Sequence, residues 1–389
     1  AAESAAVPLT TVAPPDRTVS DLLRTLAREV PDRVVIHLLA DGETTHEITA
    51  GGLYSAASAL AAVVSREIEP GQPVAIMLPT GRAFLDSFFA VLFAGGVPVP
   101  LAPPARLSQI EDHLRRQVSI LESCQAPLLI TSPEIERAAR LARLHVETLE
   151  RVATVDALRR EARSAGDFEP VAVTPGALAL LQYTSGSTGD PKGVMLTHAN
   201  LLANVAAIAE RLETAPGDVY VSWLPLYHDM GLIGGVLHAL HCRIPLVLLP
   251  PQAFLARPVR WLRAIDRFGG TMTVAPNFAY EICRRRLTDE DLEGLDLSRL
   301  RLTLNGAEVV SAATIEGFTA RFEPYGYRAD AMAPCYGLAE NTLAVSCARM
   351  GRRPTVDAID RDLLQREERA VPVTGREDAL RLVGCGPLM

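Results

Sequence analysis

Short apolar runs alternate with helix-like stretches along this chain of 389 residues, and this alternation restricts its fold more than any other feature. Continuous apolar runs such as ALALL and LVLL are typical of strands that are covered on both faces. Between residues 74 and 101, two such strands flank an amphipathic helix that stops at Gly95 and Gly96, which is the pattern of a βαβ unit. We therefore expect an α/β protein.

The same pattern continues to residue 336 and gives a full set of expected elements. Strands are predicted at residues 74–78, 97–101, 128–131, 178–183, 219–223, 245–249, 271–275, 300–304 and 331–336. Helices are predicted at residues 108–123, 133–145, 198–213, 230–240, 254–268, 276–287 and 311–322. Two doubly wound α/β halves, packed together, fit this order, with a ligand site between them at the carboxyl ends of strands.

The length of the chain exceeds what one hydrophobic core usually supports, so we expect several subdomains. Residues 1–15 are predicted to be a linker or tail, residues 16–175 the first α/β subdomain, and residues 176–345 the second, which carries the site. Residues 346–389 are expected to hold a charged insertion and the start of a third subdomain, for which a small β-barrel is one option.

The net charge, the cysteines and the apolar segments indicate which partners and which compartment this chain has. A net charge of −8 argues against a nucleic-acid partner. Six cysteines lack CxxC spacing and are expected to be free thiols in a reducing compartment. The most apolar windows are interrupted, for example by Asp86 and His238, which argues against stable membrane insertion. We expect a cytoplasmic protein.

Residues 182–193 read QYTSGSTGDPKG and contain Lys192, the only lysine in the chain. Glycines allow tight turns, hydroxyl groups donate hydrogen bonds, and the lysine adds a compact positive charge, so this loop suits a polyphosphate. It is not a Walker A loop, because Pro191 precedes the lysine and Gly193 follows it. The alternative is a flexible surface loop.

The stretch YTSGSTGDPKGVMLTHANL resembles the signature loop of the adenylate-forming enzymes, which include acyl-CoA ligases, luciferases and nonribosomal peptide adenylation domains. Three further motifs follow in that family's order: WLPLYHDMGL at residues 223–232, LNGAEVV at residues 304–310 and CYGLAEN at residues 335–341. Their particular forms are most similar to fatty acyl-AMP ligases. The resemblance extends over residues 16–389.

The resemblance implies that ATP activates a fatty acid to an acyl-adenylate, with release of pyrophosphate and Mg²⁺ as a second cofactor, for transfer to an acyl carrier protein. Lys192, His228 and Glu340 would be catalytic, and Glu340 would bind the metal. Ala339 stands where many relatives have Thr, so a hydroxyl contact is lost or moved there. The implied ATP-binding residues are Thr184, Ser185, Gly186, Ser187, Thr188, Gly189, Lys192, Asn305, Gly306, Ala307, Glu308, Tyr336, Gly337, Leu338 and Ala339.

By the same resemblance, His228 stands between the nucleotide and the acyl carboxylate, and Asp229 could orient it. Small and apolar residues would border an acyl tunnel, although plain helix packing explains each of them equally well. The implied acyl-binding residues are His228, Asp229, Gly231, Leu232, Ile233, Pro276, Asn277 and Phe278, with Gly234 and Gly235 beside them. An ordinary strand-to-helix turn is the alternative for the NGAE stretch.

Full-length relatives also carry a TGD tripeptide and a C-terminal domain with a catalytic lysine. The nearest string here, TGRED at residues 374–378, lacks the Asp at its third position, and no second lysine exists. We therefore expect a fragment that is weakly active or inactive alone. Its charged segment after residue 345 resembles the insertion that marks acyl-AMP ligases. The alternative is a surface segment without a specific function.

Two other functions stay open at this point. A long-chain fatty acyl-CoA ligase would share the four motifs and pass the acyl group to coenzyme A. A non-catalytic module that binds a nucleotide or a lipid would share the fold without the reaction.

Overall fold

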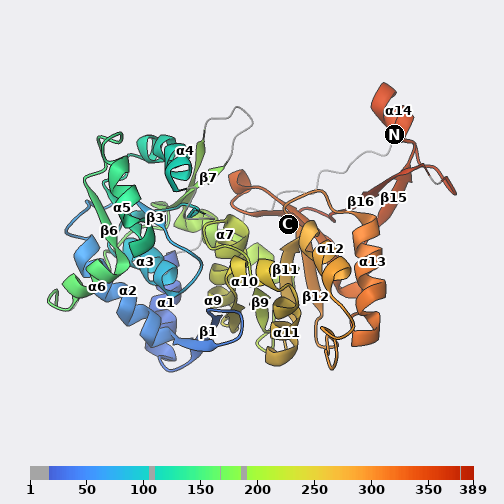
Figure 1. Cartoon of the computed structure of the whole chain (residues 1–389), viewed down its shortest axis with the longest axis horizontal. Helices are drawn as coiled ribbons and strands as arrows, with labels where there is room; N and C mark the ends of the chain where they lie inside the picture. The colour runs from blue at the N-terminus through green and yellow to red at the C-terminus, as the bar shows by residue number, and fades with distance from the viewer. Residues whose placement is uncertain (1–16, 105–109, 167, 185–190, 377) are drawn as a thin grey trace.

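The computed structural model describes residues 17–104, 110–166, 168–184, 191–376 and 378–389. Its first half, on the left in Figure 1, is built on a four-stranded sheet. The strand order is β4-β3-β5-β6, and every neighbouring pair is parallel. Parallel neighbours need crossover connections, and helices supply them. The elements are β3 (Pro73–Met77), α3 (Arg82–Phe93), β4 (Val97–Pro100), α4 (Ile110–Cys124), β5 (Leu128–Thr131), α5 (Pro133–Ala142) and β6 (Arg151–Thr154).

Helices cover both faces of this sheet, as the side chains of β3 show. Val74 and Ile76 belong to the large core that contains α3 residues, whereas Ala75 and Met77 belong to a smaller core with residues of α4 and α5. Successive residues of a strand point to opposite faces, so this division places helices on each side. The predicted doubly wound arrangement is confirmed.

The second half is built on an eight-stranded sheet in the order β14-β13-β12-β11-β9-β10-β1-β2. The six inner strands are parallel, and antiparallel strands β2 and β14 form the two edges. Two of its strands precede residue 175, so the sheet joins segments from both sides of the predicted subdomain boundary. The strands are β1 (Val34–Leu39), β2 (Thr45–Thr49), β9 (Tyr220–Ser222), β10 (Leu246–Leu248), β11 (Met272–Pro276), β12 (Leu302–Gly306), β13 (Met332–Gly337) and β14 (Ala344–Cys347).

Two of the predicted helices of this half differ in detail. The stretch predicted at 230–240 is a short α8 (Asp229–Gly231), a π-helical turn η2 (Leu232–Leu237) and α9 (His238–Cys242). The stretch predicted at 254–268 breaks between α10 (Pro251–Ala256) and α11 (Val259–Phe268), because a residue before proline, here Arg257, is kept out of the helical region. The remaining helices are α1 (Val19–Glu29), α2 (Ala50–Val64), α6 (Val155–Ala162), α7 (His198–Arg211), α12 (Asn277–Arg286) and α13 (Ala312–Phe322).

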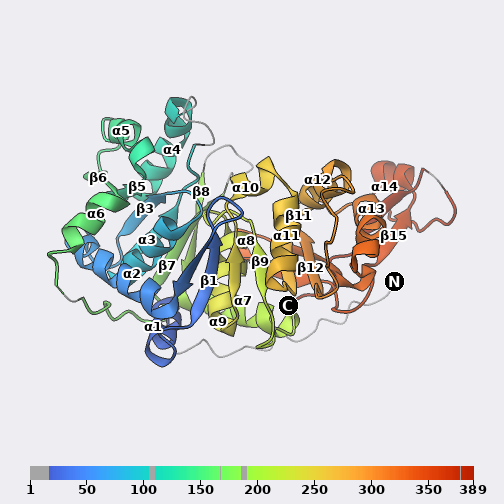
Figure 2. The same cartoon turned by 60° about the horizontal axis from the view of Figure 1, so that its bottom comes forward.

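A hairpin of β7 (Leu178–Thr184) and β8 (Lys192–Thr197) lies between the two halves (Figures 1 and 2). The strand before the predicted phosphate loop therefore returns directly after it. Thr184 and Lys192 are paired across the hairpin, so the two ends of the loop lie side by side.

The C-terminal segment forms an antiparallel ribbon of β15 (Val356–Ile359) and β16 (Leu380–Val383), joined through α14 (Arg361–Glu367). It projects beside α13 at the far end of the molecule in both views, and Arg381 forms an ion pair with Glu316 of α13. Among the described residues after 346, this ribbon is not closed into a barrel, and the third subdomain stays a prediction. No described helix is both long and apolar enough to cross a membrane. All six cysteines are free, as predicted.

Candidate nucleotide and acyl site

A pocket of about 320 Å³ lies at the carboxyl ends of β11, β12 and β13. Its position agrees with the site predicted from the order of strands and helices. Residues of all four motifs line it, although they are separated by as much as 156 positions in the sequence. The predicted site residues in the lining are Thr184, His228, Asp229, Ala307, Tyr336, Gly337, Leu338, Ala339 and Glu340.

The β7–β8 hairpin brings Thr184, the last described residue before the predicted phosphate loop, to one side of this pocket. Thr184 lines the pocket, and Lys192 is exposed directly opposite it. Gly193 packs under the Tyr183 ring, and a Cβ atom there would lie 2.9 Å from Tyr183 Cζ, which explains the glycine after the lysine. The other predicted loop residues lie outside the described residues; they are Ser185, Gly186, Ser187, Thr188 and Gly189.

The NGAE stretch forms a tight turn at the end of β12. A Cβ atom on Gly306 would lie 2.7 Å from the Cys335 sulfur, so glycine allows β12 and β13 to approach closely. Ala307 has a φ of +66°, and Asn305 is fully buried with its Oδ1 atom unpaired. The Glu308 carboxylate accepts a hydrogen bond from the Phe278 N–H at 2.6 Å, which ties this turn to the start of α12.

The segment that carries Glu340 is a second tight turn, directly after β13. A Cβ atom on Gly337 would lie 2.1 Å from the Leu343 carbonyl oxygen, and Leu338 N–H donates to that oxygen at 2.8 Å. Thr342 has a φ of +73°, which is strained for a β-branched residue, and the Leu343 N–H donates to the Asn341 carbonyl at 2.9 Å across it. This turn presents Ala339 and Glu340 to the pocket.

Glu340 is suited to a magnesium ion that also binds phosphate. Within the described ranges, no group of three or more His, Cys, Asp or Glu residues is arranged to hold a metal ion by itself. Mg²⁺ keeps several waters and usually takes only one or two protein carboxylates together with substrate phosphates. A single exposed carboxylate on the pocket wall fits that requirement.

His228 lies at the N-terminus of α8 with Asp229 as its partner. The His228 Nδ1 and Asp229 Oδ1 atoms are 2.7 Å apart, and this hydrogen bond raises the pKa of the imidazole despite its partial desolvation. Two contacts hold the preceding segment: the Leu226 N–H donates to Thr80 Oγ1 at 3.0 Å, and Gln182 Nε2 donates to the Tyr227 carbonyl at 3.3 Å. The arrangement favours a cationic imidazole beside the pocket.

Most of the buried side chains that line the pocket are apolar. Gly234 belongs to this lining, and a Cβ atom at this position would lie 2.9 Å from Leu343 Cδ2, so the glycine leaves space beside Leu343. Of the predicted acyl-binding residues, His228 and Asp229 line the pocket directly. The apolar lining residues are Ile208, Leu212, Tyr220, Met230, Val274, Leu304, Leu343, Ala344 and Met389, with Cys335 and Cys347.

The other predicted acyl-binding residues are not in this lining. Gly231, Leu232 and Ile233 are buried beside it, and Gly231 is required because a Cβ atom would lie 2.2 Å from the Pro225 carbonyl oxygen. The start of α12 is engaged elsewhere, through the Glu308 contact to Phe278. Neither Asn277 and Phe278 of α12 nor Pro276, which precedes them, is in the pocket lining.

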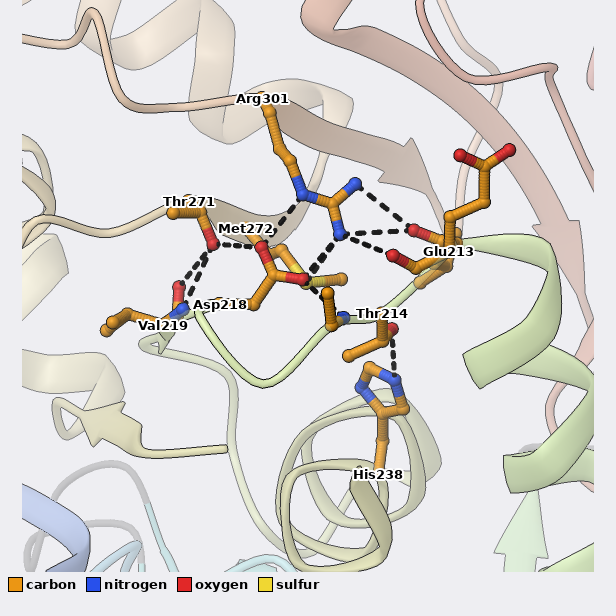
Figure 3. Close-up of polar contacts among 10 residues, drawn as sticks. Glu213, Thr214, Asp218, Val219, His238, Thr271, Met272 and Arg301 are labelled. Atoms are coloured by element: carbon orange, nitrogen blue, oxygen red, sulfur yellow. Dashed lines mark hydrogen bonds and ion pairs between the residues drawn. The ribbon is translucent and has the colours of Figure 1, made fainter. Parts of the chain in front are cut away.

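The sequence interpretation missed the wall formed by α7 and the start of β9. Ile208, Leu212 and Tyr220 come from these elements. Arg301 holds this wall in place: its guanidinium donates to the Leu212 carbonyl at 3.2 Å and to the Asp218 carboxylate at 2.6 Å (Figure 3). The apolar residues of α7 repeat at helical spacing, which signals a buried face but does not indicate what that face contacts.

The chain matches the family model of AMP-binding enzymes over residues 23–375. It is 34% identical over 376 residues to the medium-chain fatty acid acyl-carrier-protein ligase JamA of Moorena producens, covering 95% of this chain and 63% of that protein. It is 38% identical over 335 residues to the long-chain fatty acid AMP ligase FadD32 of Mycobacterium marinum, covering 84% of this chain and 52% of that protein.

Among solved structures, the fatty acyl-adenylate ligase from L. pneumophila in complex with acyl adenylate and pyrophosphate superposes with a TM-score of 0.85 at 30% identity. That match covers 95% of this chain and 64% of the other. The chain thus spans about half to two thirds of the length of these relatives. Together with the pocket that the four motifs form, the matches show that this chain belongs to the AMP-binding enzymes of the adenylate-forming superfamily and resembles their fatty acyl-AMP ligases over most of its length.

Proposed function

We propose that the protein containing this chain is a fatty acyl-AMP ligase, which activates a fatty acid with ATP and passes the acyl group to an acyl carrier protein. The observation that carries this proposal is the single pocket that joins the end of the phosphate hairpin, His228 and Glu340 to an apolar interior. A pocket that is lined by both charged or polar and apolar side chains suits an acyl-adenylate, which has a polar and an apolar part.

The reaction needs no covalent enzyme intermediate. A carboxylate oxygen of the fatty acid forms a bond to the α-phosphorus of ATP, and the bond from that phosphorus to the oxygen bridging the β-phosphorus breaks, so that pyrophosphate leaves. The chain's task is to align these atoms and to stabilise the developing negative charge. The similar L. pneumophila fatty acyl-adenylate ligase, which is in complex with acyl adenylate and pyrophosphate, supports this chemistry.

In this proposal the charged groups have separate roles. Lys192 and the loop before it neutralise the β- and γ-phosphates and the departing pyrophosphate. His228, whose pKa is raised by the hydrogen bond to Asp229, stabilises negative charge on the acyl carboxylate and the α-phosphate in its protonated form. Glu340 would hold Mg²⁺, which supplies positive charge to the phosphate oxygens when it is bound. Ala339 contributes no hydroxyl group, so the α-phosphate depends on the other groups.

The adenine ring in this proposal lies against Tyr336 and the turn at residues 305–308. Tyr336 is 55% exposed, so one face of its ring is available for stacking. The buried and unpaired Oδ1 atom of Asn305 is an acceptor beside this turn. The residues of the predicted loop outside the described ranges are proposed to bind phosphate through their backbone N–H and hydroxyl groups.

The test is mass spectrometry of the products from the full-length protein, supplied with ATP, Mg²⁺, fatty acids of several lengths, coenzyme A and a carrier protein. The proposal predicts acyl-AMP and acylated carrier protein. Acyl-CoA as the main product would instead identify a long-chain acyl-CoA ligase. ATP binding without any acyl product would identify a binding module and contradict the proposed reaction.

A further inference from the structure

Asn204 is a polar residue on α7 that reaches the turn carrying Glu340. The start of α7 is fixed by a capping box, in which Asn200 N–H donates to Thr197 Oγ1 at 3.1 Å and Thr197 N–H donates to Asn200 Oδ1 at 3.0 Å. Asn204 follows one turn later, and Ile208, one further turn along, lines the pocket. The helix thus presents an amide beside the pocket at the level of this turn.

The side chain of Asn204 satisfies three backbone groups of the turn. Its Nδ2 atom donates to the carbonyl oxygens of Ala344 at 3.0 Å and Asn341 at 3.3 Å, and its Oδ1 atom accepts from the Ala344 N–H at 3.1 Å. The Asn341 side chain adds a hydrogen bond to the Ala344 carbonyl at 2.8 Å. Only a primary amide offers both donors and an acceptor in this arrangement.

These contacts fix a backbone that is strained. The groups bound by Asn204 flank Thr342, whose positive φ is unfavourable for a β-branched side chain. A strained conformation of this kind persists only where its surroundings determine it. Glu340 lies two residues before Thr342, so relaxation of the turn would move its carboxylate relative to the hairpin that carries Lys192.

We propose that Asn204 is a positioning residue, which holds the Glu340 turn in the conformation that accepts a magnesium–nucleotide complex. This inference rests on the proposed function of Glu340. Groups that orient a metal ligand typically change metal affinity by about 10- to 100-fold when they are removed. Loss of Asn204 should therefore reduce the gain in ATP affinity that Mg²⁺ provides. The ATP affinity measured without Mg²⁺ should not change.

The experiment is calorimetric titration of ATP into the full-length protein, with Mg²⁺ at increasing concentrations and with EDTA. Mg²⁺ is expected to strengthen ATP binding by the wild-type protein. In Asn204→Ala the half-saturating Mg²⁺ concentration should rise about tenfold, while the affinity measured in EDTA stays the same. Asn200→Ala is the matched control, because it weakens the cap of the same helix without touching the Glu340 turn. Its half-saturating Mg²⁺ concentration and its ATP affinity in EDTA should match those of the wild type.

The outcomes separate the two proposals. Magnesium-dependent ATP binding that is the same in Asn204→Ala and wild type would overturn the positioning role alone. Absence of ATP binding by the full-length wild-type protein would refute the proposed function and the inference with it. If Asn204→Ala does not fold, the isosteric Asn204→Asp replaces it, because it keeps the acceptor for Ala344 but loses both donors. The same rise in half-saturating Mg²⁺ is expected, and an unchanged value would overturn the inference.

Discussion

Asp229 raises the pKa of His228 through a hydrogen bond of 2.7 Å. Asp229→Asn removes the negative charge, so the pKa of the His228 imidazole should fall, and an NMR titration of its ring protons should have a lower midpoint than in the wild type. The raised pKa contributes stability below the unfolded histidine pKa of about 6.5, and this contribution is lost as pH rises through the folded value. An unchanged midpoint would show that Asp229 does not set the charge of the imidazole.

Lys192 provides a second test at the level of single residues. It is paired with Thr184 at the end of the β7–β8 hairpin, and the chain has no other lysine that could replace it. Lys192→Ala should weaken ATP binding at least about tenfold, because hydrogen bonds to charged groups are worth about 1.5–3 kcal/mol. Lys192→Arg keeps the charge but not the compact shape, so an intermediate loss is expected. Calorimetry on the three proteins measures both effects, and equal affinities would remove Lys192 from the site.

The wall formed by α7 and β9 depends on the Arg301–Asp218 pair (Figure 3). Arg301→Ala leaves a buried carboxylate with fewer partners and the end of α7 without its cap, so unfolding free energy should fall by about 3 kcal/mol. Urea denaturation measures this change. Arg381→Ala removes an exposed ion pair of similar geometry and should leave the denaturation midpoint nearly unchanged. Equal effects of the two substitutions would contradict a structural role for Arg301.

Most strands and helices could be predicted from the sequence because their signals are local. The strand at 128–131 was predicted with its observed bounds, and most others within two residues, since continuous apolar runs mark buried parallel strands. The breaks at Pro258 and in the π-helical turn lie inside stretches that still look helical. Strands β2 and β8 were not predicted because their residues are largely polar or exposed, and β1 was also not predicted, although its residues are largely apolar and buried.

The polar end of the site could also be predicted, because the motifs that resemble the family contain Thr184, His228 and Glu340. The apolar part of the pocket lining could not be predicted from the sequence. Ile208 and Met389 line one pocket although they are far apart in the sequence, and only the fold brings them together. Phe278 stays a predicted acyl-binding residue; it is not in the lining of this pocket, its backbone N–H binds Glu308 and its ring packs against Trp223.

Two buried histidines connect distant parts of the whole molecule. His198 Nδ1 accepts the Val19 N–H of α1 at 3.1 Å, and His238 Nε2 lies 3.1 Å from Thr214 Oγ1. Burial lowers the pKa of each imidazole to about 4. The unfolded chain binds protons below pH of about 6.5 while the folded chain does not, so stability should be lost as pH falls from 6.5 toward 4.

Thermal unfolding at pH 7 and pH 5 measures this loss. The wild-type melting temperature should be lower at pH 5, and the difference should shrink in His198→Asn and His238→Gln, in which an amide keeps the hydrogen bond without titrating. His145→Gln, at an exposed position, is the control. A difference that is as large in the two buried-site variants as in the wild type would exclude these histidines as its cause.

At the scale of the whole molecule, the central claim is that one pocket holds both the nucleotide and the acyl chain. Calorimetric titration of the 389-residue chain with a hydrolysis-resistant acyl-AMP analogue, a sulfamoyl group replacing its phosphate, tests this directly. The analogue should bind more tightly than AMP, because its acyl chain is buried against apolar side chains. Gly234→Val, which fills space beside Leu343, should lower the affinity for the analogue and leave the affinity for AMP unchanged. An analogue that binds no more tightly than AMP, or equally well to both proteins, would contradict the claim.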